Sequence, residues 1–155
     1  MSSLRTRVPA IDGWFTTPID GSNPKLIGAR CGGCGTYLFP PRGGACPNPR
    51  CSSDDLQPVE LSSQGTVWSY TTNCYAPPAP FVAPEPFEPY ALVAVEMETE
   101  GIIVLGQAAE GVGVDDLKVG MPMQLDIGVL YRDDDHEYLI YTWAPAAVAQ
   151  PGTVR

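Results

Sequence analysis

The segment RCGGCGTYLFPPRGGACPNPRC, residues 30–51, holds four of the five cysteines of this 155-residue chain. They form two close pairs, Cys31-x2-Cys34 and Cys46-x4-Cys51, with eleven residues between the pairs. Two such pairs on either side of a short hairpin are typical of a zinc ribbon, because four thiolates complete a tetrahedral shell around one Zn²⁺. A shell of four cysteines leaves no position open for water, so we expect a structural site.

Three other uses of the four thiols compete with zinc binding. Two disulfides are disfavoured in a reducing compartment. A redox pair at Cys31 and Cys34 lacks a thioredoxin-like context and has a second pair close by. Iron in a rubredoxin-like site is allowed by the same four ligands. The spacing favours metal, with zinc as the expected ion. Glycines 32, 33 and 35 can supply the positive φ that a tight turn needs, and the four residues between Cys46 and Cys51 make an unusually long second turn.

The composition predicts a mainly β chain. Seventeen prolines and 16 glycines are too many for a helical protein, and 44% hydrophobic residues suffice for a core. Beyond the cysteines, the alternation of apolar and polar residues predicts five strands, at residues 66–72, 90–97, 101–106, 121–131 and 137–143. With one helical turn at residues 114–120, this order fits a five-stranded barrel of the OB type. An immunoglobulin-like sandwich is the alternative, but it needs about seven strands.

These elements divide the chain into four parts. Residues 1–29 form an N-terminal extension with a short helical turn at residues 11–16 and a strand at residues 25–28 that leads into the cysteines. Residues 30–58 form the rubredoxin-like zinc ribbon, with a short strand at residues 36–39. Residues 59–145 form the OB-type barrel, which includes a proline-rich stretch at residues 76–89 and an acidic hairpin tip at residues 133–135. Residues 146–155 form a flexible tail.

Charge is distributed unevenly along the chain. Residues 1–51 carry six basic and two acidic residues, whereas residues 52–155 carry three basic and 16 acidic residues, a balance of −13. Zinc ribbons and OB barrels both occur in nucleic-acid-binding proteins, and Trp68, Tyr70 and Tyr75 could stack on bases, so nucleic-acid binding is the alternative function. The acidic balance argues against it, because binding to phosphates depends on Lys and Arg. We therefore expect no nucleic-acid partner.

The sequence contains neither a secretory signal nor an apolar run long enough to span a membrane. We therefore expect a cytoplasmic protein without a membrane partner. The sequence also lacks a catalytic set. The fifth cysteine, Cys74, is more typical of a small packed residue than of a nucleophile, and the single histidine, His136, lies beside the acidic tip. The chain is accordingly not expected to be an enzyme by itself.

Several short motifs together resemble a known family. They are RCxxCG at residues 30–35, FPPR at residues 39–42, Cys46-Pro47, GTVWSYT at residues 65–71 and LKVGM at residues 117–121. In this order they resemble the zinc-ribbon plus OB-fold accessory proteins encoded beside thiolases and thiolase-like acyl-CoA aldolases, a domain-of-unknown-function family. The likeness covers about residues 11–145. That family usually has two residues between the third and fourth cysteines, whereas this chain has four.

The resemblance implies a non-catalytic zinc-binding subunit. Its partner would be a thiolase-like or lipid-transfer-protein-like catalytic subunit in a hetero-oligomer that acts on a CoA thioester. The family's roles include thiolysis, steroid side-chain aldol cleavage and acyl transfer. Aromatic residues of the ribbon and of the proline-rich stretch are the predicted contacts with the partner or the substrate entrance, because interface cores are rich in aromatic anchors. These residues are Tyr37, Phe39, Tyr75, Phe81 and Phe87.

Overall fold

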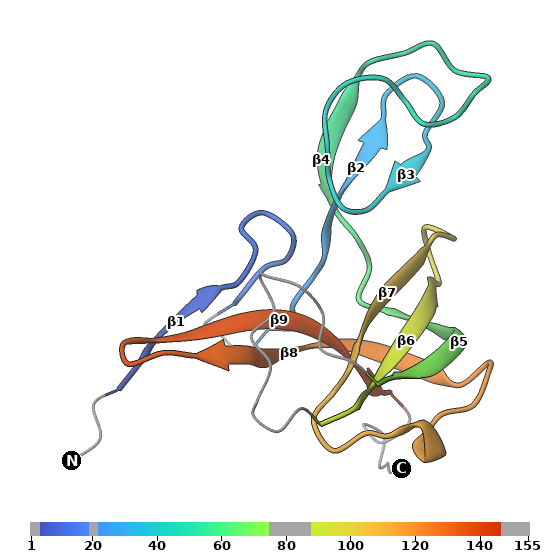
Figure 1. The fold of residues 1–155 in the computed structure, drawn as a ribbon. Helices are drawn as coiled ribbons and strands as arrows, with labels where there is room; N and C mark the ends of the chain where they lie inside the picture. The colour runs from blue at the N-terminus through green and yellow to red at the C-terminus, as the bar shows by residue number, and fades with distance from the viewer. Residues whose placement is uncertain (1–3, 19–21, 75–87, 147–155) are drawn as a thin grey trace.

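The computed structural model describes residues 4–18, 22–74 and 88–146 of the chain, and within them the fold is mainly β (Figure 1). No helix among these residues is long and apolar enough to cross a membrane. The described elements are β1 (Thr6–Pro9), β2 (Ile27–Cys31), β3 (Tyr37–Leu38), β4 (Leu56–Glu60), β5 (Gln64–Asn73), β6 (Tyr90–Met97), β7 (Ile103–Ala108), the 3-10 turn η1 (Val114–Asp116), β8 (Pro122–Arg132) and β9 (His136–Pro145).

Five strands close into a barrel. Antiparallel pairing joins β5 to β6, β6 to β7, β9 to β8 and β8 back to β5, and a short parallel pairing between β7 and β9 completes the circuit. The turn η1 lies between the third and fourth of these strands. This is the predicted OB-type barrel. Because the barrel is closed, each of its five strands pairs with a neighbour on both sides over at least part of its length.

The barrel interior is filled by the inward-facing residues of all five strands. Period-2 alternation is clearest in β5, where Gly65 and Val67 are buried while Thr66 and Trp68 are exposed. The other four strands also bury apolar residues, because every second side chain of a pleated strand points to the same face of the sheet. The largest that are fully buried lie in β6, β8 and β9: Met97, Met123, Leu125 and Trp143.

Strands β8 and β9 form a long hairpin that extends beyond the barrel (Figure 1). Residues 133–135 are its tip, as predicted. The carboxylate of Asp133 accepts hydrogen bonds from the Tyr138 hydroxyl and from the backbone amides of Asp135 and His136. These bonds stabilise the charged form and lower the pKa of Asp133 to about 2. The acidic tip is therefore a hydrogen-bonded turn as well as a cluster of solvated charges.

A second, three-stranded sheet carries the cysteines. Its order is β3-β2-β4, and in Figure 1 it lies above the barrel. The prediction missed β4, because Pro58 interrupts its sequence and proline is rare inside a sheet. The structure tolerates Pro58 because β4 is an edge strand that pairs only with β2.

Strand β1 was also missed. It has only four residues and pairs in parallel with the first half of β9, next to the hairpin tip. A strand this short carries too few residues for alternation to be recognised. Strand β7 pairs only with the second half of β9. Strand β1 pairs with the first half and so adds one strand to the barrel sheet.

The helical turn predicted at residues 11–16 is wrong. Residues 10–14 form bends and a turn that contains Gly13 at φ +84°, and Phe15 forms an antiparallel bridge with Leu26. Phe15 is 4% exposed. Burial of Phe15 in the core, together with a glycine in the left-handed region, overrides the weak helical tendency of this segment.

Candidate metal centre

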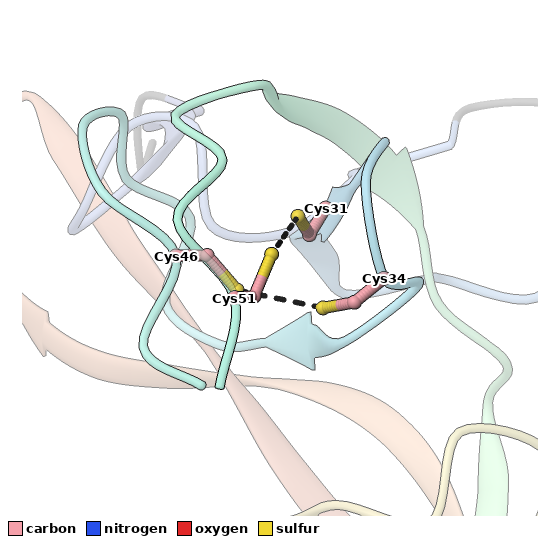
Figure 2. A group of neighbouring side chains, drawn as sticks. All are labelled: Cys31, Cys34, Cys46 and Cys51. Atoms are coloured by element: carbon pink, nitrogen blue, oxygen red, sulfur yellow. Dashed lines mark hydrogen bonds between the residues drawn. The ribbon is translucent and has the colours of Figure 1, made fainter. Parts of the chain in front are cut away.

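The four cysteines of the ribbon converge on one point (Figure 2). Their sulfur atoms all lie within 4.8 Å of one another. The Cys31 and Cys51 sulfurs are 3.8 Å apart, and those of Cys34 and Cys46 are 3.6 Å apart. Four ligands at a Zn–S distance of about 2.3 Å form a tetrahedron with edges of about 3.8 Å. The sulfur positions therefore fit a tetrahedral metal ion.

The first pair is held by the turn between β2 and β3. Cys31 is the last residue of β2, and its amide and carbonyl bond to Thr36 and Gly35 across the turn. The amide of Gly33 points at the Cys31 sulfur, 3.3 Å away, where it can stabilise a thiolate. Of the three glycines predicted to take positive φ in this turn, only Gly35 does so, at +80°.

The other two glycines of this turn lie close to the chain that follows the second cysteine pair. A Cβ atom at Gly32 would lie 2.2 Å from the Asp55 carboxylate, and one at Gly33 would lie 2.9 Å from the Ser53 Cβ. The amide of Gly32 also donates to the carbonyl of Asp55. The first turn is therefore packed directly against the chain that follows the second cysteine pair.

The second pair is held by a longer turn that Asn48 organises. The amide of Asn48 points at the Cys46 sulfur at 3.5 Å, and its carbonyl accepts from the amide of Cys51. Its side-chain oxygen accepts from the amide of Arg50. The turn has two residues more than is usual in the family, and an Asx-type turn at Asn48 accommodates them. Both sulfurs of the second pair still face the first pair.

The four thiols do not ionise equally. Hydrogen bonding from the Thr36 side chain and backbone lowers the pKa of Cys34 to about 6. The amide of Asn48 acts to lower the pKa of Cys46, but burial and the neighbouring sulfurs outweigh it and raise that pKa to about 11. Four adjacent thiolates repel one another, so only a bound cation would favour deprotonation of all four. This donor set suits a divalent metal.

Two of the aromatic residues predicted to contact a partner, Tyr37 and Phe39, pack against other residues of this chain. Tyr37 is half-buried, and the Arg30 guanidinium lies over its ring at 5.4 Å. Phe39 packs edge-on against Trp14 at 5.4 Å and against Tyr141 of β9 at 5.6 Å. Phe39 therefore anchors the ribbon to the barrel. Tyr75, Phe81 and Phe87 lie outside the described residues.

We expect Phe39→Ala to uncouple the ribbon from the barrel. The change removes both ring contacts and costs about 3 kcal/mol for a half-buried site of this kind. The measurement is urea unfolding followed separately by zinc release and by the amide NMR signals of β5 to β9. Trp68→Ala is the control, because Trp68 is an aromatic residue of β5 that is 56% exposed and makes neither of these ring contacts. Equal loss of stability in both variants would contradict the anchoring role.

In the part of the chain that the structure describes, no catalytic set surrounds the two residues considered for one, His136 and Cys74. The His136 imidazole lies 3.5 Å from the Asp133 carboxylate and beside the Tyr138 ring, on the exposed hairpin tip. Cys74 is exposed at the end of β5, where its sulfur contacts the Thr72 carbonyl. Among the described residues, neither group is placed beside a second one with which it could form a nucleophile and base.

Comparison with known proteins matches both parts of the chain to one family. The family models describe a ChsH2 rubredoxin-like zinc ribbon domain, matched by residues 21–57, and a ChsH2 C-terminal OB-fold domain, matched by residues 58–127. A DUF35 domain-containing scaffold protein of Methanocaldococcus jannaschii is 32% identical over 119 residues, which cover 75% of this chain and 77% of that protein.

Two further relatives are named for enzymes of CoA or aldol chemistry. A probable enoyl-CoA hydratase alpha subunit of Thermomonospora curvata is 34% identical over 149 residues, 93% of this chain, but the match spans only 41% of that protein. The solved structure of an Ltp2-ChsH2(DUF35) aldolase is similar with a TM-score of 0.58 and 31% sequence identity. That match covers 79% of this chain and 85% of the solved one.

Proposed function

Because the chain belongs to the DUF35 family of ChsH2-type proteins, in which a rubredoxin-like zinc ribbon precedes an OB-fold domain, we propose that it is the non-catalytic subunit of a thiolase-superfamily enzyme. The observation that carries the proposal is its likeness to the Ltp2-ChsH2(DUF35) aldolase structure at 31% identity. The described residues, which assemble no nucleophile and base, are compatible with this role.

The metal of this subunit is one Zn²⁺ held by Cys31, Cys34, Cys46 and Cys51. The support is the tetrahedral spacing of the four sulfurs and the backbone amides directed at two of them. Bound zinc would supply the positive charge that keeps all four thiols deprotonated, and would thereby tie the two turns of the ribbon together. Its role is structural, because the four cysteines fill the coordination shell.

The substrate of the complex is an acyl-CoA thioester. The name of one relative, a probable enoyl-CoA hydratase alpha subunit, supports this class. Thiolysis and steroid side-chain aldol cleavage are both compatible with a thiolase-type partner. We place the complex in the cytoplasm as a hetero-oligomer. We retain Tyr75, which directly precedes the proline-rich stretch, and Phe81 and Phe87 within it as candidates for the substrate entrance.

Co-expression with the thiolase-superfamily protein encoded beside this chain tests the proposal. The expected result is co-elution in size-exclusion chromatography, together with CoA-release or aldol-cleavage activity that the partner lacks alone. This chain alone should be inactive in both assays. A partner that is soluble and fully active without this chain would refute the proposed role.

A further inference from the structure

The outer face of β5, β6 and β7 carries an apolar strip. In the strand register, Ser69 of β5 lies opposite Ala94 of β6, which lies opposite Leu105 of β7. Trp68 lies next to Ser69 and is 56% exposed, and Leu105 is 57% exposed. Ile103, two residues before Leu105 on the same side of β7, is 44% exposed. We call these three exposed residues, Trp68, Ile103 and Leu105, the barrel strip.

A β-bulge directs Trp68 into this strip. The register of β5 against β6 shifts between Val67 and Ser69, so Trp68 is the extra residue of the bulged strand. On the other side of β5, the Gly120 amide bonds to the Val67 carbonyl, which places Val119, 70% exposed, beside the bulge. Bulges often re-aim a side chain at functional positions. Four of the six large apolar residues that are most exposed in the described chain therefore gather here.

The charge around the barrel strip restricts what can cover it. Residues 59–145 contain 14 acidic residues but only two cations, Lys118 and Arg132. Arg132 is paired with Glu137 near the hairpin tip. In the rung next to Trp68 and Leu105, the acidic Glu96 lies between Thr66 and Ile103. A polyanion such as single-stranded nucleic acid or an anionic lipid surface would meet repulsion here, although stacking on Trp68 would be available.

We propose that the barrel strip is the docking surface for the catalytic subunit. This inference rests on the proposed function and identifies where the partner binds. The complementary surface has an apolar centre that accepts Trp68 and a cationic group opposite Glu96, because a buried aromatic anchor inside a polar rim is the usual arrangement of an interface. The ring of Phe39 in the ribbon, in contrast, packs against Trp14 and Tyr141 of this chain.

The test measures the affinity of the purified chain for the purified thiolase-superfamily protein encoded beside it. We expect Trp68→Ala and Leu105→Glu each to raise Kd at least tenfold, about 1.4 kcal/mol or more. The two residues lie on different strands, so misfolding of one variant leaves the other informative. Leu4→Glu is the matched control, because Leu4 is 99% exposed near β1 and should leave Kd within twofold. Zinc content and the urea midpoint verify that each variant is folded.

The outcomes separate this inference from the proposed function. If the wild-type chain binds and both barrel-strip variants bind equally well, the docking surface is wrong and the subunit role stands. If the wild-type chain does not bind the catalytic protein, the proposed function fails and the docking surface fails with it. Two further results would overturn the docking surface: saturable binding of a dT oligonucleotide that Trp68→Ala abolishes, or self-association of the chain that Trp68→Ala abolishes.

Discussion

Cys46→Ser should release the metal and unfold the ribbon while the barrel stays folded. Cys46 is 8% exposed and closes the sulfur cluster from the second turn, 3.6 Å from the Cys34 sulfur. In zinc-dependent modules the binding free energy, about 10–16 kcal/mol, is folding free energy. The ribbon contains only three short strands, so it has little else to hold it together.

Metal analysis and amide NMR spectra measure this result. Freshly purified wild-type protein should contain about one equivalent of zinc. The variant should lose it, with collapse of the dispersed signals from β2, β3 and β4 and retention of those from β5 to β9. Cys74→Ser is the matched control, because Cys74 is exposed and lies outside the cluster, and it should keep both zinc and fold. Wild-type protein that is folded and essentially metal-free would contradict the structural site.

Trp143→Ala should destabilise the barrel by about 3–5 kcal/mol, a large share of the 5–15 kcal/mol that is typical of a domain. Trp143 is completely buried in β9, and its ring lies against Gly106 of β7, where a Cβ atom would come within 3.1 Å of it. This contact lies where β7 and β9 complete the barrel, so the cavity left by alanine would form at the closure itself. Urea unfolding followed by circular dichroism measures the loss.

Trp68→Ala is the matched control for this prediction, because the same atoms are removed from an exposed position. It should cost clearly less than Trp143→Ala, because more than half of the Trp68 side chain is already exposed to water. Trp143→Phe should cost less than Trp143→Ala. It fills part of the space and removes the Nε1 donor, which is the buried side-chain polar atom without a hydrogen-bond partner among the described residues. Similar losses for the two Trp→Ala variants would show that the barrel core is misplaced.

The sequence by itself determined the four-cysteine cluster of a metal site, the mainly β fold and the family. Cysteine spacing is local information, since each close pair must lie on one turn and two turns suffice for a tetrahedral site. The barrel strands were recognisable because a strand with one buried face alternates with period two, as in β5. Together these patterns carried the resemblance that the family models and the structural match confirm.

Only the tertiary structure decided what lies beside what. Strands β1 and β4 exist because β9 and β2 offer them a pairing edge, which is invisible in four or five residues of their own sequence. Phe39 and Trp68 look alike in sequence, as aromatic residues at strand positions, yet Phe39 is enclosed by Trp14 and Tyr141 while a bulge exposes Trp68. The exposure of a side chain depends on neighbours that are distant in sequence, and these are fixed only when the barrel closes and the ribbon packs on it.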